Sequence, residues 1–390
     1  MPQANLQKTY LDNASTSFPK PRQVADAVFR FMTEVGTNAG RGEYADALGT
    51  DDMVFSAREK LCALFGGEDP SCIVFTRNVT ESLNLVLKGA LKPGDHVIVS
   101  SMEHNAVMRP LTQLAARGIE FSRARCAPDG TLDPREVERL ARPDTKMVVM
   151  THASNVCGTV LPLEEVGRAA RELGLLFVVD AAQTAGVLPV SLDKLCADAI
   201  CFTGHKGLLG PQGIGGAVLA RDFAKKIEPL VAGGTGSASS SEEMPGFLPD
   251  RLEAGTLNLP GIAGLLAALD WLEERGAQEI LDHEQRLVAA FIDGLSELEA
   301  RGLARIVGLR GARGRTGVVS IQTPGRDLAE VAHGLDARFG IQTRVGLHCA
   351  PAAHRTLGTF PAGTIRFSFG WANTPSDVAR ALDALDELLG

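Results

Sequence analysis

Lys206, Asp180 and Gln183 are the residues of this chain whose types and spacing are best suited to do chemistry. Lys206 follows an apolar run at residues 200–203, and five glycines follow it before residue 217. A lysine at a strand end is often an ordinary solvated charge. It is also a candidate Schiff-base lysine, because a partly desolvated amine loses its proton more readily.

The segment upstream favours a cofactor. The apolar run at residues 175–179 ends in Asp180, and Gln183 comes three positions later. An aspartate at the end of a strand can hold a protonated pyridine nitrogen, and a glutamine can hydrogen-bond the phenolic oxygen of the same ring. Together with Lys206 they are the partners of pyridoxal 5'-phosphate (PLP), whose electron-sink chemistry needs a charged ring nitrogen.

With these residues, and with Arg-Val-Gly-Leu-His-Cys-Ala at residues 344–350, the chain resembles the class V aminotransferase-like PLP enzymes over nearly its whole length. Within that group it resembles the cysteine desulfurases. The resemblance implies the fold type I of PLP-dependent transferases, an α/β fold with a mostly parallel seven-stranded sheet flanked by helices and a smaller α/β C-terminal domain. It also implies conversion of L-cysteine to L-alanine, with sulfane sulfur left on Cys349 as a persulfide.

The alternation of strand-like and helix-like segments between residues 71 and 220 independently predicts a mostly parallel α/β sheet. Polar residues follow successive strands at their carboxyl ends, where open α/β sheets bind ligands. Long helical segments begin near residue 261. We therefore expect a large PLP-binding domain at residues 15–255, and a small domain at residues 256–390 that includes the N-terminal segment 1–14.

A strand-to-helix turn at residues 76–80 is suited to an anion, because free N–H groups and the helix dipole point at one spot. Thr80 can also simply cap the helix. The resemblance implies that Val79 and Thr80 bind the phosphate of PLP, together with Thr203 and His205.

The resemblance assigns three further residues to the cofactor. His104 would stack on its ring and shuttle protons, although a lone histidine after a strand is more often structural. Asn155 would bond the phenolic oxygen beside Gln183. The segment Glu-Ala-Gly-Thr ends at Thr256, which would reach the phosphate of a partner subunit, so a homodimer with shared sites is expected.

Cys349 has two interpretations. A free cysteine is most often a small apolar residue. A nucleophile needs exposure and a lowered pKa, which Arg344, His348 and His354 could favour. The resemblance selects the nucleophile, although many family members have a second histidine where this chain has Leu347.

The substrate carboxylate is expected at Arg366, because a guanidinium binds a carboxylate as a fork. The alternative is an ordinary charge on an edge strand, which the apolar neighbours of Arg366 disfavour. The resemblance also places Arg344, Asn13 and Arg41 at the substrate site.

Composition limits the partners. The 390 residues carry a net charge of −8 with both signs interspersed, which argues against nucleic acid or an anionic membrane. No apolar run approaches bilayer length, and the polar N-terminus lacks a signal region. Seven cysteines without a CxxC pair fit a reducing cytoplasm, and no metal site is predicted. A sulfur-acceptor protein is a further candidate partner.

The residues leave three alternatives open. One is another PLP enzyme on the same fold: a selenocysteine lyase, a cysteine sulfinate desulfinase or a class V aminotransferase. A second is a non-catalytic sulfur-carrier or scaffold protein. The third, a dinucleotide-binding enzyme, ranks low because the turn at residues 76–80 lacks the G-x-G-x-x-G pattern.

Overall fold

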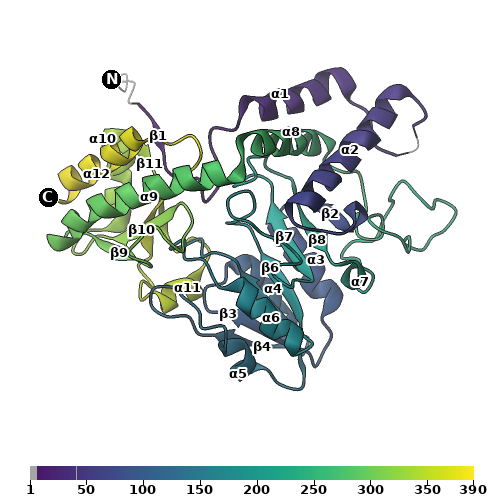
Figure 1. The fold of residues 1–390 in the computed structure, drawn as a ribbon, viewed down its shortest axis with the longest axis horizontal. Coiled ribbons are helices and arrows are strands. Elements are labelled where there is room, and N and C mark those ends of the chain that lie inside the picture. Colours follow the sequence, from purple (N-terminus) through teal and green to yellow (C-terminus); the bar gives the residue numbers. More distant parts are fainter. Residues whose placement is uncertain (1–6, 41) are drawn as a thin grey trace.

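The computed structural model describes residues 7–40 and 42–390 of the chain, which form a larger and a smaller α/β body (Figure 1). Within these residues the strands make a seven-stranded sheet, a four-stranded sheet and a two-stranded pair. The larger body contains α1 (Arg22–Arg30), the π-helical turn η1 (Phe31–Val35), α2 (Ala45–Leu64), the 3-10 turn η2 (Pro70–Cys72), β2 (Ile73–Thr76), α3 (Val79–Ala90), β3 (His96–Ser100), α4 (Asn105–Ala115), β4 (Glu120–Ala124), α5 (Glu136–Leu140), β5 (Thr145–Thr151), α6 (Leu163–Glu172), β6 (Leu176–Asp180), β7 (Ala199–Thr203), β8 (Gly215–Leu219), α7 (Arg221–Ala224) and α8 (Leu259–Arg275).

The large sheet has the strand order β2-β8-β7-β6-β5-β3-β4. Strands β3 to β7 run parallel to one another, and β8 runs antiparallel to both β7 and β2. Every residue of β3, β7 and β8 is buried, as expected when helices cover both faces of a sheet. The α/β class and the mostly parallel sheet predicted from the sequence are confirmed.

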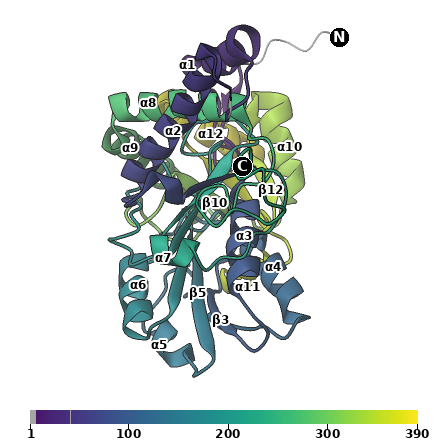
Figure 2. The ribbon, with the colours of Figure 1, turned by 90° about the vertical axis from the view of Figure 1, so that its right-hand side faces the viewer.

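Aliphatic side chains from the two faces of the sheet enter two separate cores. Along β3, Ile98 packs on the face covered by α6, whereas Val97 and Val99 pack on the face covered by α3 and α4. Figure 2 shows α6 and the α3–α4 pair on opposite sides of the strands. Because parallel strands end at the same edge, this arrangement brings the residues that follow β3, β5, β6 and β7 together.

Helix α8 packs against α1 and α2, and its apolar residues join the core of the large body. The sequence-based boundary at residue 256 assigns α8 to the small domain. The packing instead favours a division at Gly276, which separates α8 from α9.

The smaller body has an antiparallel sheet in the order β12-β13-β10-β9, and β1 pairs in parallel with β11. Leu11 of the N-terminal segment packs into the same core as Phe291 and Phe367. Among the described residues, no helix is both long enough and apolar enough to cross a bilayer. The elements are β1 (Thr9–Tyr10), α9 (Ala277–Ala300), β9 (Arg305–Val307), β10 (Val318–Gln322), α10 (Leu328–Phe339), β11 (Ile341–Gln342), β12 (Arg344–Gly346), α11 (Pro351–Thr356), β13 (Thr364–Ser368) and α12 (Pro375–Leu389).

Candidate active site

Lys206 lies in the glycine-rich loop that follows β7. A Cβ atom on the adjacent Gly207 would lie 2.6 Å from the carbonyl oxygen of Ala185, so glycine allows this loop to pack against the segment after β6. Burial lowers the pKa of the Lys206 amine to about 8, with Asp180 opposing the shift and Arg366 adding to it. An amine with this pKa is partly neutral near physiological pH, as a base or nucleophile needs to be.

Asp180 is the last residue of β6, and its side chain is enclosed. The residue is 2% exposed, and Oδ1 accepts a 2.9 Å hydrogen bond from the Ala182 N–H. Burial raises the carboxyl pKa, while the Ala182 N–H and Lys206 oppose the rise. Oδ2 receives no hydrogen bond from any described residue. A carboxylate oxygen without a donor, on a residue that is nearly enclosed, is suited to a protonated ring nitrogen.

His104 caps the N-terminus of α4. Its Nδ1 accepts a 3.0 Å hydrogen bond from the Ala106 N–H, which leaves the ring proton of the neutral form on Nε2. Burial, and then the positive charges of Lys206 and Arg366, lower the pKa of His104 to about 4. The imidazole is therefore neutral and lies near enough to Lys206 to respond to its charge.

The turn before α3 offers free backbone donors. Asn78, and not Thr80, is the N-cap, because its Oδ1 accepts the Glu81 N–H at 3.1 Å. The expectation that Thr80 caps the helix is therefore wrong. Val79 and Thr80 occupy the first helical positions, and their N–H groups have no acceptor among the described residues.

Two buried side chains at the same edge also lack partners. Thr203 Oγ1 and His205 Nδ1 are buried and make no hydrogen bond within the described chain. Thr203 and Thr76 both pair with Gly215, so the ends of β7 and β2 lie about 10 Å apart, on either side of one strand. The unsatisfied donors of this edge fit a phosphate.

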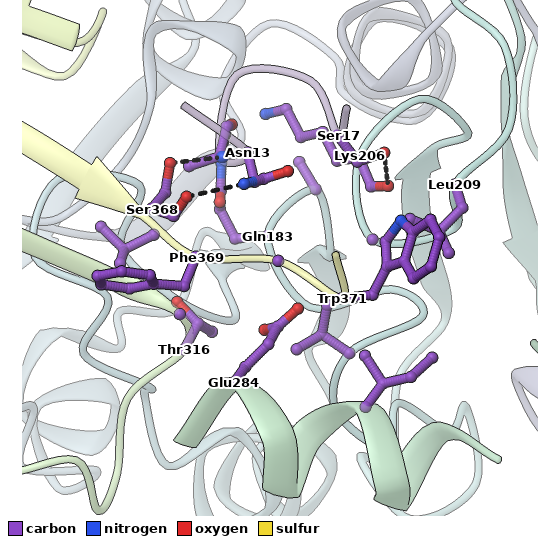
Figure 3. A pocket seen from close by; sticks show the side chains of 18 residues that line it. Asn13, Ser17, Gln183, Lys206, Leu209, Glu284, Thr316, Ser368, Phe369 and Trp371 are labelled. Atoms are coloured by element: carbon purple, nitrogen blue, oxygen red, sulfur yellow. Dashed lines mark hydrogen bonds between the residues drawn. The ribbon is translucent and has the colours of Figure 1, made fainter. Parts of the chain in front are cut away.

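The two amides predicted for the phenolic oxygen have different partners in the chain. Gln183 Nε2 donates to Ala14 O at 3.1 Å, and Gln183 lines a cavity of about 40 Å³ with Asn13 and Lys206 (Figure 3). Asn155 lies outside this cavity, and its Nδ2 donates to His348 O at 2.7 Å. Asn155 therefore contacts the segment that carries Cys349.

Arg366 is 2% exposed and lies on β13, an interior strand of the small sheet, which removes the alternative of an edge-strand charge. Its Nη2 bonds Asp12 Oδ1 at 2.9 Å and Ser15 Oγ at 2.7 Å, while Nε has no partner. Arg344 stands opposite Arg366 in the sheet and donates to the Asp12 carboxylate at 2.9 Å. One carboxylate thus bridges two guanidinium groups.

Asp12 received no role from sequence reasoning. The available signal was an acid within the Leu-Asp-Asn-Ala segment and two arginines far along the chain, and nothing local connects them. The neighbouring Asn13 donates to Ser368 O at 2.9 Å and accepts the Phe18 N–H at 3.2 Å. Its predicted contact with substrate stays a prediction, as does that of Arg41, which lies outside the described residues.

Cys349 is exposed and lies between β12 and α11. Its carbonyl accepts the Asn105 N–H at 2.8 Å, and it lines an open pocket of about 430 Å³ with His104 and Thr80. Burial lowers the pKa of both nearby histidines, so these neutral rings supply no positive charge to the thiol. The expectation that His348 and His354 favour a lowered thiol pKa through positive charge is therefore wrong. Of the three residues named for this role, Arg344 alone is a cation.

The class-V aminotransferase family model matches residues 9–381. A probable cysteine desulfurase from Methanothermobacter thermautotrophicus is 33% identical, over 98% of this chain and 94% of its own length. A cysteine desulfurase from Haloferax volcanii is 34% identical, over 97% of this chain and 88% of its own length. The chain belongs to the cysteine desulfurase family of class V aminotransferases.

Solved structures of this family have the same fold. The apo structure of a cysteine desulfurase from Thermococcus onnurineus superposes with a TM-score of 0.91 at 33% identity, covering 98% of this chain and 94% of that one. The cysteine desulfurase CsdA from Escherichia coli gives a TM-score of 0.86 at 31% identity, covering 98% and 95%. The chain therefore has the fold type I expected from its sequence.

Within this family the cofactor is PLP, and the residues present fit it. The orphaned donors at Thr203 and His205, the free N–H groups of Val79 and Thr80, and the buried carboxylate of Asp180 match a phosphate and a charged ring nitrogen. In a single chain Thr256 does not line the pocket that contains Lys206 or the pocket that contains Thr80. It is exposed and lines a different pocket, with Thr76 and Arg77.

Proposed function

We propose that this protein is a PLP-dependent cysteine desulfurase that converts L-cysteine to L-alanine and takes the released sulfur onto Cys349. The observation that carries the proposal is that the exposed Cys349 thiol shares a pocket with His104 and Thr80. Lys206 lies close enough to His104 to lower its pKa. A nucleophilic thiol and a cofactor-type lysine thus both lie near one imidazole.

PLP, when bound, supplies an electron sink that labilises the bonds around the substrate Cα atom. Lys206 would carry it covalently, Asp180 would hold its ring nitrogen and His104 would stack on its ring. Gln183 and Asn155 would hold its phenolic oxygen. The phosphate ligands would be Val79, Thr80, Thr203 and His205 of one subunit and Thr256 of the partner.

The chain's own groups carry the proton and the sulfur. Lys206, with a pKa near 8, can accept the Cα proton and return one, while the neutral His104 offers its Nε2–H. Arg366 would bind the substrate carboxylate, and Arg344 lies beside it in the small sheet. The Cys349 thiolate attacks the substrate sulfur. The C–S bond breaks, its electron pair takes up a proton at Cβ, and the products are L-alanine and a Cys349 persulfide.

The protein would work as a homodimer with shared sites. In one chain Thr256 lines a pocket that does not include Lys206, and Phe29, Met32 and Phe55 are more than half exposed on α1, η1 and α2. Exposed large apolar side chains of this kind are typical of a protein interface. The unsatisfied Thr203 and His205 donors are consistent with a phosphate that also needs a partner's donor.

We place this chemistry in the cytoplasm. All seven cysteines are free, and the mechanism needs Cys349 as a reduced thiol. Because the Cys349 pocket is open, its persulfide would be accessible to a sulfur-acceptor protein.

The test is to mix PLP-loaded protein with L-cysteine and measure both alanine and enzyme-bound sulfane sulfur. We expect equal amounts in the first turnover, and neither from Cys349→Ala. Cys126→Ala is the matched control, because burial raises the pKa of Cys126 to about 11 and makes it a poor nucleophile. Undiminished alanine from Cys349→Ala would exclude the persulfide route and favour a lyase or desulfinase.

A further inference from the structure

The turn at residues 154–158, which follows β5 of the large body, is held by the small body. Four successive carbonyls of this turn each accept a hydrogen bond from a small-body donor. Asn155 O accepts from Arg366 Nη1 at 3.0 Å, Val156 O from Ser320 Oγ at 2.5 Å, Cys157 O from Arg315 Nη2 at 2.7 Å, and Gly158 O from the Thr316 N–H at 3.0 Å.

Arg315 shows how firmly this turn is fixed. It is 1% exposed, and its guanidinium bonds the carbonyls of Cys157, Leu309 and Val318, with no acidic partner among the described residues. Gly158 has a positive φ of 79°, and a Cβ there would lie 2.6 Å from Val318 O. These contacts fix the position of the turn relative to the small sheet. The backbone that carries the Asn155 side chain is therefore fixed as well.

The side-chain amide of Asn155 contacts the segment that contains His348 and Cys349. His348 and Cys349 both have positive φ, 47° and 57°, which non-glycine residues rarely adopt and which surrounding contacts must maintain. Three hydrogen bonds hold this backbone: the Ala350 N–H donates to Leu347 O at 2.8 Å within the turn, Asn155 Nδ2 donates to His348 O at 2.7 Å, and the Asn105 N–H donates to Cys349 O at 2.8 Å. The Asn155 and Asn105 bonds come from outside the turn. The Asn155 bond comes from the turn after β5, next to the cofactor site.

The amide of Asn155 has a donor to spare. Its Nδ2 carries two hydrogens, and His348 O uses one of them. We propose that Asn155 is a positioning residue for Cys349: one N–H holds the carbonyl before the nucleophile while the other holds the phenolic oxygen of the cofactor. A single amide then sets the place of the thiol relative to the ring. The cofactor half of this proposal rests on the proposed function, and the Cys349 half does not.

Gln183 provides a matched control. It is the second amide predicted for the same cofactor oxygen, but its Nε2 bonds Ala14 O and does not reach the Cys349 segment. Removing either amide weakens the hold on the cofactor oxygen. Only removal of the Asn155 amide frees the His348 carbonyl.

The first experiment uses the apoprotein, so it does not depend on the desulfurase assignment. Amide hydrogen exchange at residues 347–350 and the rate of Cys349 alkylation by iodoacetamide are compared in wild type, Asn155→Ala, Asn155→Asp and Gln183→Ala. Loss of one hydrogen bond should raise exchange about five- to tenfold in both Asn155 variants and leave Gln183→Ala at the wild-type rate. The rate of Cys349 alkylation should change in the same variants in which amide exchange changes. Asn155→Asp keeps the side-chain volume, and unchanged exchange in β3 and β5 shows that each variant is folded.

The second experiment adds PLP and measures the same exchange. If the Asn155 amide joins the Cys349 segment to the cofactor, PLP should slow exchange at residues 347–350 in wild type and in Gln183→Ala, but not in Asn155→Ala. Wild-type exchange and alkylation in both Asn155 apoprotein variants would overturn the proposal. Equal protection by PLP in Asn155→Ala and wild type would overturn the bridge to the cofactor.

Discussion

Asp12→Asn is the substitution that tests the electrostatics of the substrate site. Asp12 is the carboxylate partner of Arg366, whose side chain is 3% exposed, and of Arg344, whose side chain is 50% exposed. Burial already lowers the pKa of Arg366, and Asp12 opposes that shift. Asparagine keeps the shape of Asp12 and removes its charge, which leaves a buried guanidinium without a counter-ion.

The two ion pairs of Asp12, with Arg366 and with Arg344, should contribute different amounts to the free energy of unfolding. Removing one partner of a buried ion pair costs about 3–5 kcal/mol, because the remaining charge stays desolvated. A pair with one solvent-exposed member is worth about 0–1 kcal/mol. Asp12→Asn should therefore lower the free energy of unfolding by about 3 kcal/mol, whereas Arg344→Gln should lower it by less than about 1 kcal/mol.

Urea unfolding of the apoprotein measures this difference. The only two tryptophans of the chain, Trp271 and Trp371, pack edge to face with ring centroids 4.9 Å apart, so their fluorescence reports the junction between α8 and the segment after β13. The slope of unfolding free energy against urea should be the same in each variant. A small carboxylate such as acetate should recover part of the Asp12→Asn loss by binding Arg366, and should do little for wild type.

Equal losses in Asp12→Asn and Arg344→Gln would refute the reasoning, because Asp12 would then not be the counter-ion of the buried arginine. Absence of any acetate effect on Asp12→Asn would contradict the view that Arg366 is a carboxylate site.

Two further substitutions follow from buried carboxyl groups. Burial raises the pKa of Glu284, which points into the cavity of Figure 3, from 4.5 to about 8. The folded state therefore binds more protons in that window, and the stability contribution of Glu284 is full below pH 4.5 and falls as pH rises towards 8, by at most about 1.4 kcal/mol per pH unit. Glu284→Gln should become progressively more stable than wild type across this range in urea unfolding, and a pH-independent difference would contradict the prediction. Asp180→Asn removes the charge expected to pair with the ring nitrogen, so PLP titration should show affinity about ten- to a hundredfold weaker, the effect of one charge-assisted hydrogen bond; unchanged affinity would mean that Asp180 does not face the ring.

The features that sequence predicted well depend on local patterns. Apolar runs gave six of the seven strands of the large sheet and the polar residues at their ends, such as Asp180 at the end of β6, but not β4, whose sequence is mostly polar. The N-terminus of α12 also has a local sequence signal, because Thr374 and Asp377 form the reciprocal cap that their three-residue spacing permits. The comparison with known families then supplied the chemistry that these strand ends suggest.

Helix α2 and the cap of α3 show where local patterns were insufficient. The apolar residues of α2 are not confined to one face: Val54 and Leu61 are buried, while Leu48 and Phe55 are more than half exposed. A single amphipathic stripe, the usual helix signal, is therefore missing. At α3, both Asn78 and Thr80 are residue types that can cap a helix. In the structure Asn78 is the N-cap, and its backbone packs against Gly215.

The contacts that make the site join residues far apart in the chain. Asp12 meets Arg366 across 354 positions, and Asn155 meets His348 across 193. Neither pair has a local signature, because each depends on how the two bodies pack. The neutral state of His348 likewise follows from burial, which its charged neighbourhood in the sequence did not indicate.

The most direct test of the account is to identify the lysine that binds the cofactor. Burial lowers the pKa of two lysines, Lys206 and Lys20, each to about 8, so both are reactive candidates for an aldehyde. PLP-loaded protein is reduced with borohydride, digested and mapped by mass spectrometry. We predict one pyridoxyl group, on Lys206. A pyridoxyl group on Lys20, or none on the chain, would contradict the central claim.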